Sequence, residues 1–152
     1  MQIKGVEIDE FTAAYLEAAL WSSVNMDSEE EEPLDENYEI EDFSREALLE
    51  AQEETEDFRD MAGSLLDEVD EEMAGHDFWL TRNHHGAGFW DRGYPGHVGD
   101  GLTELAHSFG DQHPLVGDDG ELHGMSPRQA PQAHKKKKKK PRRRGSGFEF
   151  LN

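Results

Sequence analysis

The chain has 152 residues, which is about the size of one domain. Its formal net charge is −20, from 35 acidic and 15 basic residues, and it has no cysteine. These values exclude a multidomain enzyme, a disulfide scaffold, a thiolate zinc site and a body that attracts nucleic acid by its bulk charge.

The charge is divided unevenly along the chain. Residues 1–127 hold 34 acidic and five basic residues, a net charge of −29, whereas residues 128–152 hold ten basic residues and one acidic residue, a net charge of +9. We therefore expect an acidic domain over residues 1–125 and a disordered basic tail over residues 126–152. Because the acidic domain repels itself, salt or a cationic partner should stabilise it.

Residues 8–21 predict the first helix, with Asp9 as its N-cap and an apolar stripe that runs from Phe11 to Trp21. This stretch is too short to span a membrane, and no secretion signal precedes it, so we expect a cytoplasmic protein. Residues 27–42 are mostly acidic and predict a loop with a short strand at 38–40. The loop lacks the ligand spacing of an EF-hand, so we expect no specific calcium site there.

The second predicted helix begins at Ser44, a favourable N-cap, with Phe43 and Leu48 forming a hydrophobic staple. Apolar residues at a spacing of three and four continue to Val69, which predicts one buried stripe on a long amphipathic helix. Gly63 marks a bend in this helix or a break into two helices.

The following segment predicts β-structure and one short helix. Residues 77–82 and 89–91 favour a β-hairpin, and residues 115–116 and 121–123 favour a second one. Between the hairpins, Asp100 is the predicted N-cap of a helix that ends before Gly110. The expected fold class is therefore α+β, with two longer helices and a short helix packed on a small antiparallel sheet of hairpins.

Residues 76–93 read His-Asp-Phe-Trp-Leu-Thr-Arg-Asn-His-His-Gly-Ala-Gly-Phe-Trp-Asp-Arg-Gly. This segment resembles the motif of a family of small acidic proteins encoded by tailed bacteriophages, in which glycine usually stands at the position of His84. The segments 11–23 and 116–120 resemble the ends of the same family. The resemblance implies a phage origin and the cytoplasm of an infected bacterium, but no activity, and the basic tail lies outside it.

The second helix suggests mimicry of nucleic acid. Residues 44–72 contain twelve acidic residues, or one charge per about 3.6 Å of helix, close to the ~3.4 Å per strand of duplex DNA. A phage protein with this surface would bind a basic host or phage protein, such as a host-defence nuclease, and would not bind nucleic acid itself. The alternatives are a solvated acidic face without a partner and an accessory phage protein with no inhibitory role. The residues predicted to contact the partner are Glu46, Glu50, Glu53, Glu54, Asp57, Asp60, Glu68 and Glu71.

An enzymatic alternative is a metal-dependent ββα-type phosphodiesterase, with His84 and His85 at a strand end and His107 on the next helix. Two observations oppose it, because His107 lies opposite the apolar stripe of its helix and the acidic body repels a phosphodiester. We therefore predict a protein that is not an enzyme and has no catalytic residue, cofactor or metal. The residues of the motif that would form a site are Arg82, Asn83, His84, His85, Trp90, Asp91 and Arg92.

Two further features have more than one interpretation. Trp79, Phe89 and Trp90 favour core packing, while exposure beside Arg82 and Arg92 would indicate a partner-binding patch. The run Lys135–Lys140 with Arg142–Arg144 is typical of nuclear-localisation and nucleic-acid-binding segments, and it could also bind acidic surfaces such as the predicted helix. Its flanking Gly-Ser-Gly and Glu-Phe residues favour an artificially appended linker.

Overall fold

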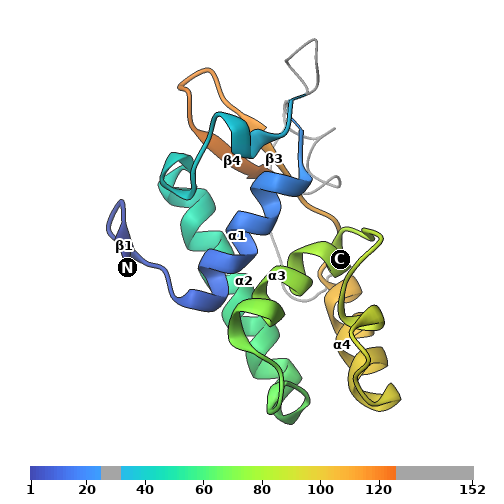
Figure 1. Ribbon diagram of the computed structural model, residues 1–152. Helices are drawn as coiled ribbons and strands as arrows, with labels where there is room; N and C mark the ends of the chain where they lie inside the picture. The colour runs from blue at the N-terminus through green and yellow to red at the C-terminus, as the bar shows by residue number, and fades with distance from the viewer. Residues whose placement is uncertain (25–31, 126–152) are drawn as a thin grey trace.

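The computed structural model describes residues 1–24 and 32–125 of the chain. The predicted tail and the first part of the predicted acidic loop lie outside these residues. In the described part, two small antiparallel hairpins accompany a group of helices, which confirms the α+β class (Figure 1). The helices are α1 (Glu10–Ser22), α2 (Arg45–Ala62), α3 (Glu71–Arg82) and α4 (Gly96–Ser108), and the strands are β1 (Gln2–Ile3), β2 (Val6–Glu7), β3 (His113–Val116) and β4 (Leu122–Met125).

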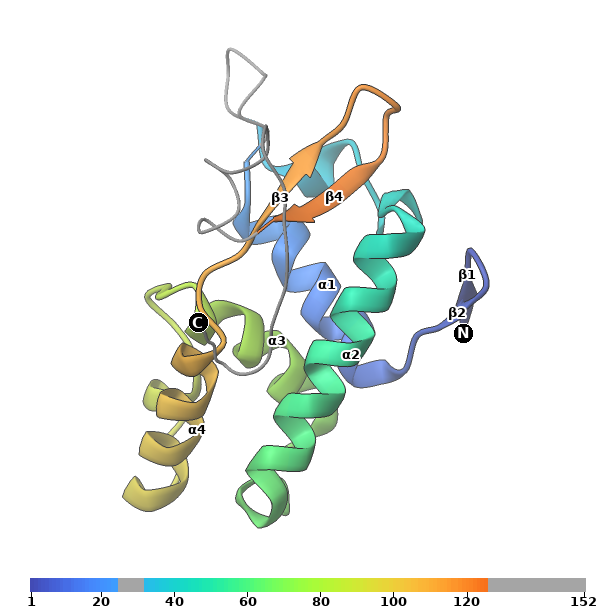
Figure 2. The same ribbon diagram turned by 180° about the vertical axis from the view of Figure 1, so that it is seen from behind.

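Helix α1 is the central helix of the fold and packs along α3 (Figures 1 and 2). Asp9 caps it by accepting a hydrogen bond from the backbone N–H of Thr12, as predicted. Buried residues lie on most sides of α1, so the single stripe predicted from the sequence is too narrow. Its last predicted member, Trp21, is 47% exposed and stacks on His76 instead of entering the core.

Helix α2 begins after Ser44, whose hydroxyl accepts a hydrogen bond from the N–H of Ala47, and this confirms the predicted cap. The helix ends at Gly63, which has a φ of +51° and starts a 3-10 turn that continues to Leu66. A new cap at Asp70 then starts α3. The predicted break at Gly63 is therefore confirmed, and the predicted continuous helix over about 25 residues is not.

The predicted hairpin over residues 77–91 is wrong. Residues 77–82 form the second half of α3, and Phe89–Asp91 form a 3-10 helix. Every residue from 77 to 82 is buried, and a helix that is buried on all sides has no amphipathic period for a sequence pattern to reveal. Gly75 permits this burial, because a Cβ atom there would lie 2.1 Å from the carbonyl oxygen of Phe11 on α1.

Three smaller predictions have mixed outcomes. Helix α4 begins at Gly96 after Pro95, four residues before the predicted cap Asp100, but the predicted stop at Gly110 is confirmed by its φ of +79°. The predicted strand at 38–40 is replaced by a 3-10 helix over Ile40–Asp42. The second predicted hairpin is confirmed as β3–β4, and it packs on the start of α2 through a 2.8 Å hydrogen bond from Ser44 N–H to the Leu122 carbonyl.

The core is aromatic where α2, α3 and α4 meet. The rings of Phe58 and Phe78 stack at 4.1 Å, and Phe89 and Phe109 complete the group, with Phe89 5.7 Å from Phe58 and Phe109 5.1 Å from Phe78. Such aromatic pairs stabilise a fold beyond the area that they bury. Among the described helices, none has both the length and the apolar composition needed to cross a bilayer.

Candidate functional site

The outward face of α2 carries a row of exposed carboxylates, formed by Glu46, Glu53, Asp57 and Asp60. At about 1.5 Å per residue, this outer row extends over roughly 21 Å of the helix axis. Exposed acidic residues, among them Glu68 and Glu71, continue through the turn after α2 and into the first turn of α3. The described surface therefore retains six of the eight residues predicted to contact a basic partner.

The other two predicted contact residues, Glu50 and Glu54, lie on the inward side of α2. Glu54 Oε1 accepts a 2.8 Å hydrogen bond from Arg82 Nη1, and Glu50 Oε1 accepts a 2.8 Å hydrogen bond from Gln112 Nε2. Both carboxylates are thus occupied by partners within the fold. We correct the prediction for these two residues and remove them from the partner-binding surface.

Arg82 is the centre of this interior cluster and is only 1% exposed. Its guanidinium donates to the backbone carbonyls of Gly110 (2.7 Å) and Phe109 (2.9 Å), to the Tyr15 hydroxyl (2.8 Å) and to Glu54. Burial opposes the charge of Arg82, but the nearby Glu54 carboxylate outweighs it and raises the Arg82 pKa. Arg82 therefore ties the end of α4 to α1 and α2, which is a structural role and not the predicted site role.

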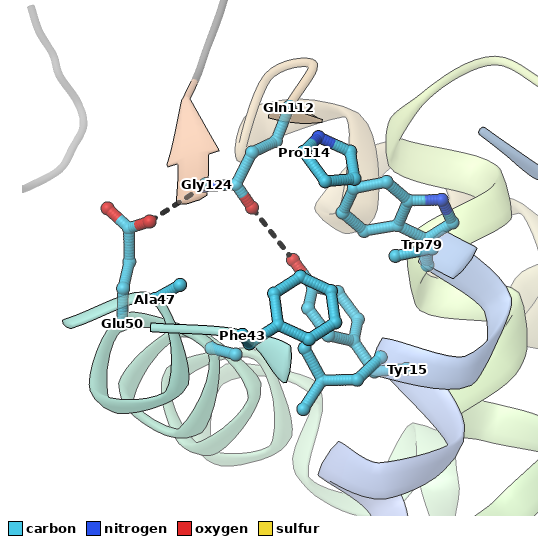
Figure 3. A pocket seen from close by; sticks show the side chains of 11 residues that line it. Tyr15, Phe43, Ala47, Glu50, Trp79, Gln112, Pro114 and Gly124 are labelled. Carbon is cyan, nitrogen blue, oxygen red and sulfur yellow. Dashed lines mark hydrogen bonds between the residues drawn. The ribbon is translucent and has the colours of Figure 1, made fainter. Parts of the chain in front are cut away.

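Glu50 stands beside a small cavity, shown in Figure 3. Gln112 links Glu50 to the Tyr15 hydroxyl, while Phe43 and Trp79 contribute apolar walls. Burial and the neighbouring charge of Glu54 raise the pKa of Glu50 to about 8, so its carboxyl is mostly protonated at neutral pH. The cavity volume of about 20 Å³ suits a single water molecule and is too small for an organic substrate.

Three other residues of the predicted site motif are also held by the fold. Arg92 forms two hydrogen bonds, of 2.9 and 2.6 Å, with the fully buried carboxylate of Asp77. Asn83 ends α3 and accepts a 2.8 Å hydrogen bond from the backbone N–H of Gln112. Asp91 accepts a 3.1 Å hydrogen bond from the N–H of Gly88. The motif therefore fixes the path of the chain after α3.

The aromatic residues of the motif are divided between the core and the surface. Trp79 and Phe89 are buried in the core, which confirms core packing for these two side chains. Trp90 is 54% exposed and is therefore available at the surface. A single exposed aromatic ring is normal for a soluble domain and does not define a binding patch.

The histidines do not form the predicted ββα layout, because helix α3, and not a β-hairpin, directly precedes His84. His84 has a left-handed backbone with a φ of +58°, and its ring stacks on the exposed His107 ring at 4.2 Å. Its Nε2 atom lies 3.7 Å from Asp111 Oδ1, which is too long for a hydrogen bond. Partial burial lowers the pKa values of His85 and His107, so both rings are mainly neutral at pH 7. The exposure of His107 agrees with its predicted position opposite the apolar stripe.

Sequence reasoning missed two residues that organise this region. Asp77 lies in an otherwise apolar run, and an acidic residue in such a run is the signal for a buried ion pair. Gln112 bonds both to Tyr15 and to Glu50, but its place in a loop gave no sequence signal for this role. Asp77 therefore anchors Arg92, and Gln112 supports the cluster around Arg82 through Tyr15.

Comparisons of the chain with protein-family models, with curated proteins and with solved structures found no match.

Proposed function

We propose that the protein is a phage-encoded binding protein that occupies a nucleic-acid-binding surface of a basic bacterial or phage protein. The observation that supports this proposal is the exposed outer row on α2, which is formed by the carboxylates of Glu46, Glu53, Asp57 and Asp60. We place its action in the cytoplasm of the infected host, in accord with the phage resemblance of residues 76–93.

The spacing of the outer row is compatible with mimicry of a phosphate backbone. Its members are seven, four and three residues apart, which corresponds to steps of about 10.5, 6 and 4.5 Å along the helix axis. Successive phosphates advance about 3.4 Å along the axis of one DNA strand, so the three steps lie nearest to three, two and one phosphate intervals, respectively. A protein surface built to contact phosphates can therefore meet several of these carboxylates at once.

Rigidity of α2 supports the same proposal. The helix is fixed from inside by the Arg82–Glu54 ion pair, by the Thr12–Thr55 hydroxyl hydrogen bond of 2.6 Å and by the buried ring of Phe58. Because the helix backbone is already ordered, the outer row loses little conformational freedom on binding. The strong negative charge would also accelerate encounter with a basic partner, an effect that salt weakens.

The test is displacement of DNA by two matched charge-reversal variants. The row variant is E46K/E53K/D60K, and the control variant E10K/D35K/E36K reverses three exposed carboxylates elsewhere. The two variants are matched in that Glu10, like Glu46, lies in the first turn of an α-helix. Each protein is titrated into the heparin-binding fraction of a bacterial lysate that carries a fluorescent DNA duplex. The parent and the control variant should release the duplex at low salt, and the row variant should lose this effect.

Two results would contradict the proposal. Release of the duplex by the row variant at the parent's concentration would show that the outer row is not the contact surface. Absence of release by the parent at every salt concentration would favour an accessory phage protein or a solvated face without a partner. Thermal unfolding of all three proteins verifies that each remains folded.

A further inference from the structure

The turn of the β3–β4 hairpin brings together Asp119, Glu121 and His123. One ligand atom from each of these side chains lies within 4.8 Å of the other two, and among residues 1–24 and 32–125 this is the group of three that meets that distance. We propose that this hairpin end is a binding site for a divalent transition-metal ion of the Zn²⁺ class. The proposal is independent of the acidic surface on α2, which contributes no ligand to it.

The backbone conformation of the turn positions the three ligand side chains. The N–H of Gly117 donates to the Glu121 carbonyl at 2.8 Å, and the N–H of Glu121 donates to Asp119 Oδ1 at 2.9 Å. Glu121 and His123 are two residues apart in an extended segment, so their side chains project to the same side. His123 Nε2 then lies 3.2 Å from both carboxylate oxygens of Asp119.

Gly117 leaves the space in which two of the ligands meet. A Cβ atom at this position would lie 2.7 Å from Asp119 Oδ1 and 2.7 Å from His123 Nε2. Any other residue would therefore push the carboxylate or the imidazole away. Because Gly117 has no side chain, both groups can lie against the turn before any ion binds.

Lys4 is not a ligand, but it orients the carboxylate of Glu121. Its ammonium group donates to Glu121 Oε2 and, at 2.6 Å, to the Phe43 carbonyl, which fixes one carboxylate oxygen and leaves Oε1 for an ion. Carboxylates that bind metals are commonly held in this way by a second hydrogen-bonding group. The single charge of Lys4 is smaller than that of the two carboxylates, and the chain as a whole is strongly negative.

The donor set determines the class of ion. One imidazole nitrogen and two carboxylates favour a borderline ion such as Zn²⁺, whereas Ca²⁺ requires six to eight oxygen ligands and Mg²⁺ prefers oxygen and water. Three protein ligands leave at least one coordination position for water. Because Asp119 is exposed and the other two ligands are half-buried, an ion can enter from solvent.

The test is calorimetric titration of the full chain with zinc chloride. The variants H123A and D119N remove one ligand each, G117A keeps every ligand but fills the space between two of them, and H97A removes an exposed histidine elsewhere as the control. We expect one zinc ion per chain at this site, at least tenfold weaker binding in H123A, D119N and G117A, and unchanged binding in H97A. Thermal unfolding without zinc identifies any variant that has lost its fold, and H123Q then replaces H123A.

Proton NMR of the histidine rings in the parent gives a readout that needs no variant. Zinc should shift the ring signals of His123 first. Shifts confined to His84 and His107 would overturn the proposal, because they would place the ion at the stacked pair after α3. Unchanged zinc affinity in H123A would overturn it as well, and so would the absence of any zinc binding by the parent.

Discussion

The inward and outward sides of α2 carry the same residue types for different purposes. On the inward side, Glu54 neutralises the buried Arg82, and Glu50 keeps its proton beside Gln112. On the outward side, Glu46 and Glu53 face solvent and form part of the outer row. Acidic content alone therefore does not define a binding surface, since neighbouring carboxylates on one helix can belong to the core or to the surface.

The largest expected effect comes from removing the centre of the interior cluster. R82M deletes the guanidinium, leaves Glu54 without its buried partner and frees the carbonyls of Phe109 and Gly110. Loss of one member of a buried ion pair costs about 3–5 kcal/mol, so we expect a loss of that size in the free energy of urea unfolding. R45M, at an exposed arginine, should change it by about 0.5 kcal/mol or less. Equal effects of the two variants would contradict the central position of Arg82.

Adjacent residues offer the sharpest test of the two sides of α2. E54Q leaves the charge of Arg82 buried without its carboxylate and should cost about 2–3 kcal/mol, because Glu54 is partly exposed. E53Q makes the same chemical change on the outward side and should stay within about 0.5 kcal/mol. Urea unfolding of the two variants in one buffer measures the difference, and a larger loss in E53Q would reverse the assignment of sides.

The raised pKa of Glu50 predicts that the stability of the fold falls as pH rises. Its pKa is about 8 in the folded chain and about 4.5 in the unfolded chain, so below pH 4.5 both states are protonated and no penalty exists. Between pH 4.5 and 8 the Glu50 carboxyl ionises only in the unfolded chain, so a rising pH favours unfolding progressively. E50Q should therefore be more stable than the parent by roughly 1–2 kcal/mol near pH 8 and equal to it near pH 4. Chemical unfolding at both pH values measures this, and an unchanged difference would refute the raised pKa.

The lowered pKa of Asp9 predicts the opposite dependence, in which the stability of the fold decreases as pH falls in the acid range. Partial burial opposes its ionisation, but hydrogen bonds from Thr12, Gln52 and Arg59 lower its pKa to about 2, against 3.8 in the unfolded chain. This contribution is present above pH 3.8 and is lost as pH falls towards 2. D9N keeps an efficient N-cap but removes the charge, so it should lose roughly 0.5–1 kcal/mol at pH 6 and less at pH 2. A loss that is the same at both pH values would indicate capping alone.

Local signals in the sequence predicted the parts of the fold that depend on neighbouring residues. The caps at Asp9 and Ser44, the break at Gly63 and the β3–β4 hairpin each rest on contacts within a few residues of the chain. The hairpin predicted over 77–91 failed because residues 77–82 of α3 are all buried, and this burial is set by α1 and α4, which lie far away in the sequence.

The candidate site was predictable only in part. Glu54 lies close in helical phase to Ala51 and Phe58, so its inward position could have been predicted from the sequence. Glu50 lies one heptad before the exposed Asp57 and on nearly the same helix face, so helical phase alone could not have separated these two carboxylates. Their partners could not be foreseen, because Arg82 and Gln112 approach from a different helix and from a distant loop. The group at Asp119, Glu121 and His123 also needed the hairpin register before its ligand atoms could be brought together.

The central claim is that the outward carboxylates of α2 bind a basic partner while the inward ones hold the fold. The most direct test compares E46K/E53K/D60K with E10K/D35K/E36K in the displacement of a fluorescent duplex from heparin-binding bacterial proteins. We predict that the first variant loses displacement, that the second retains it, and that both melt close to the parent temperature. Equal displacement by the two folded variants would contradict the claim.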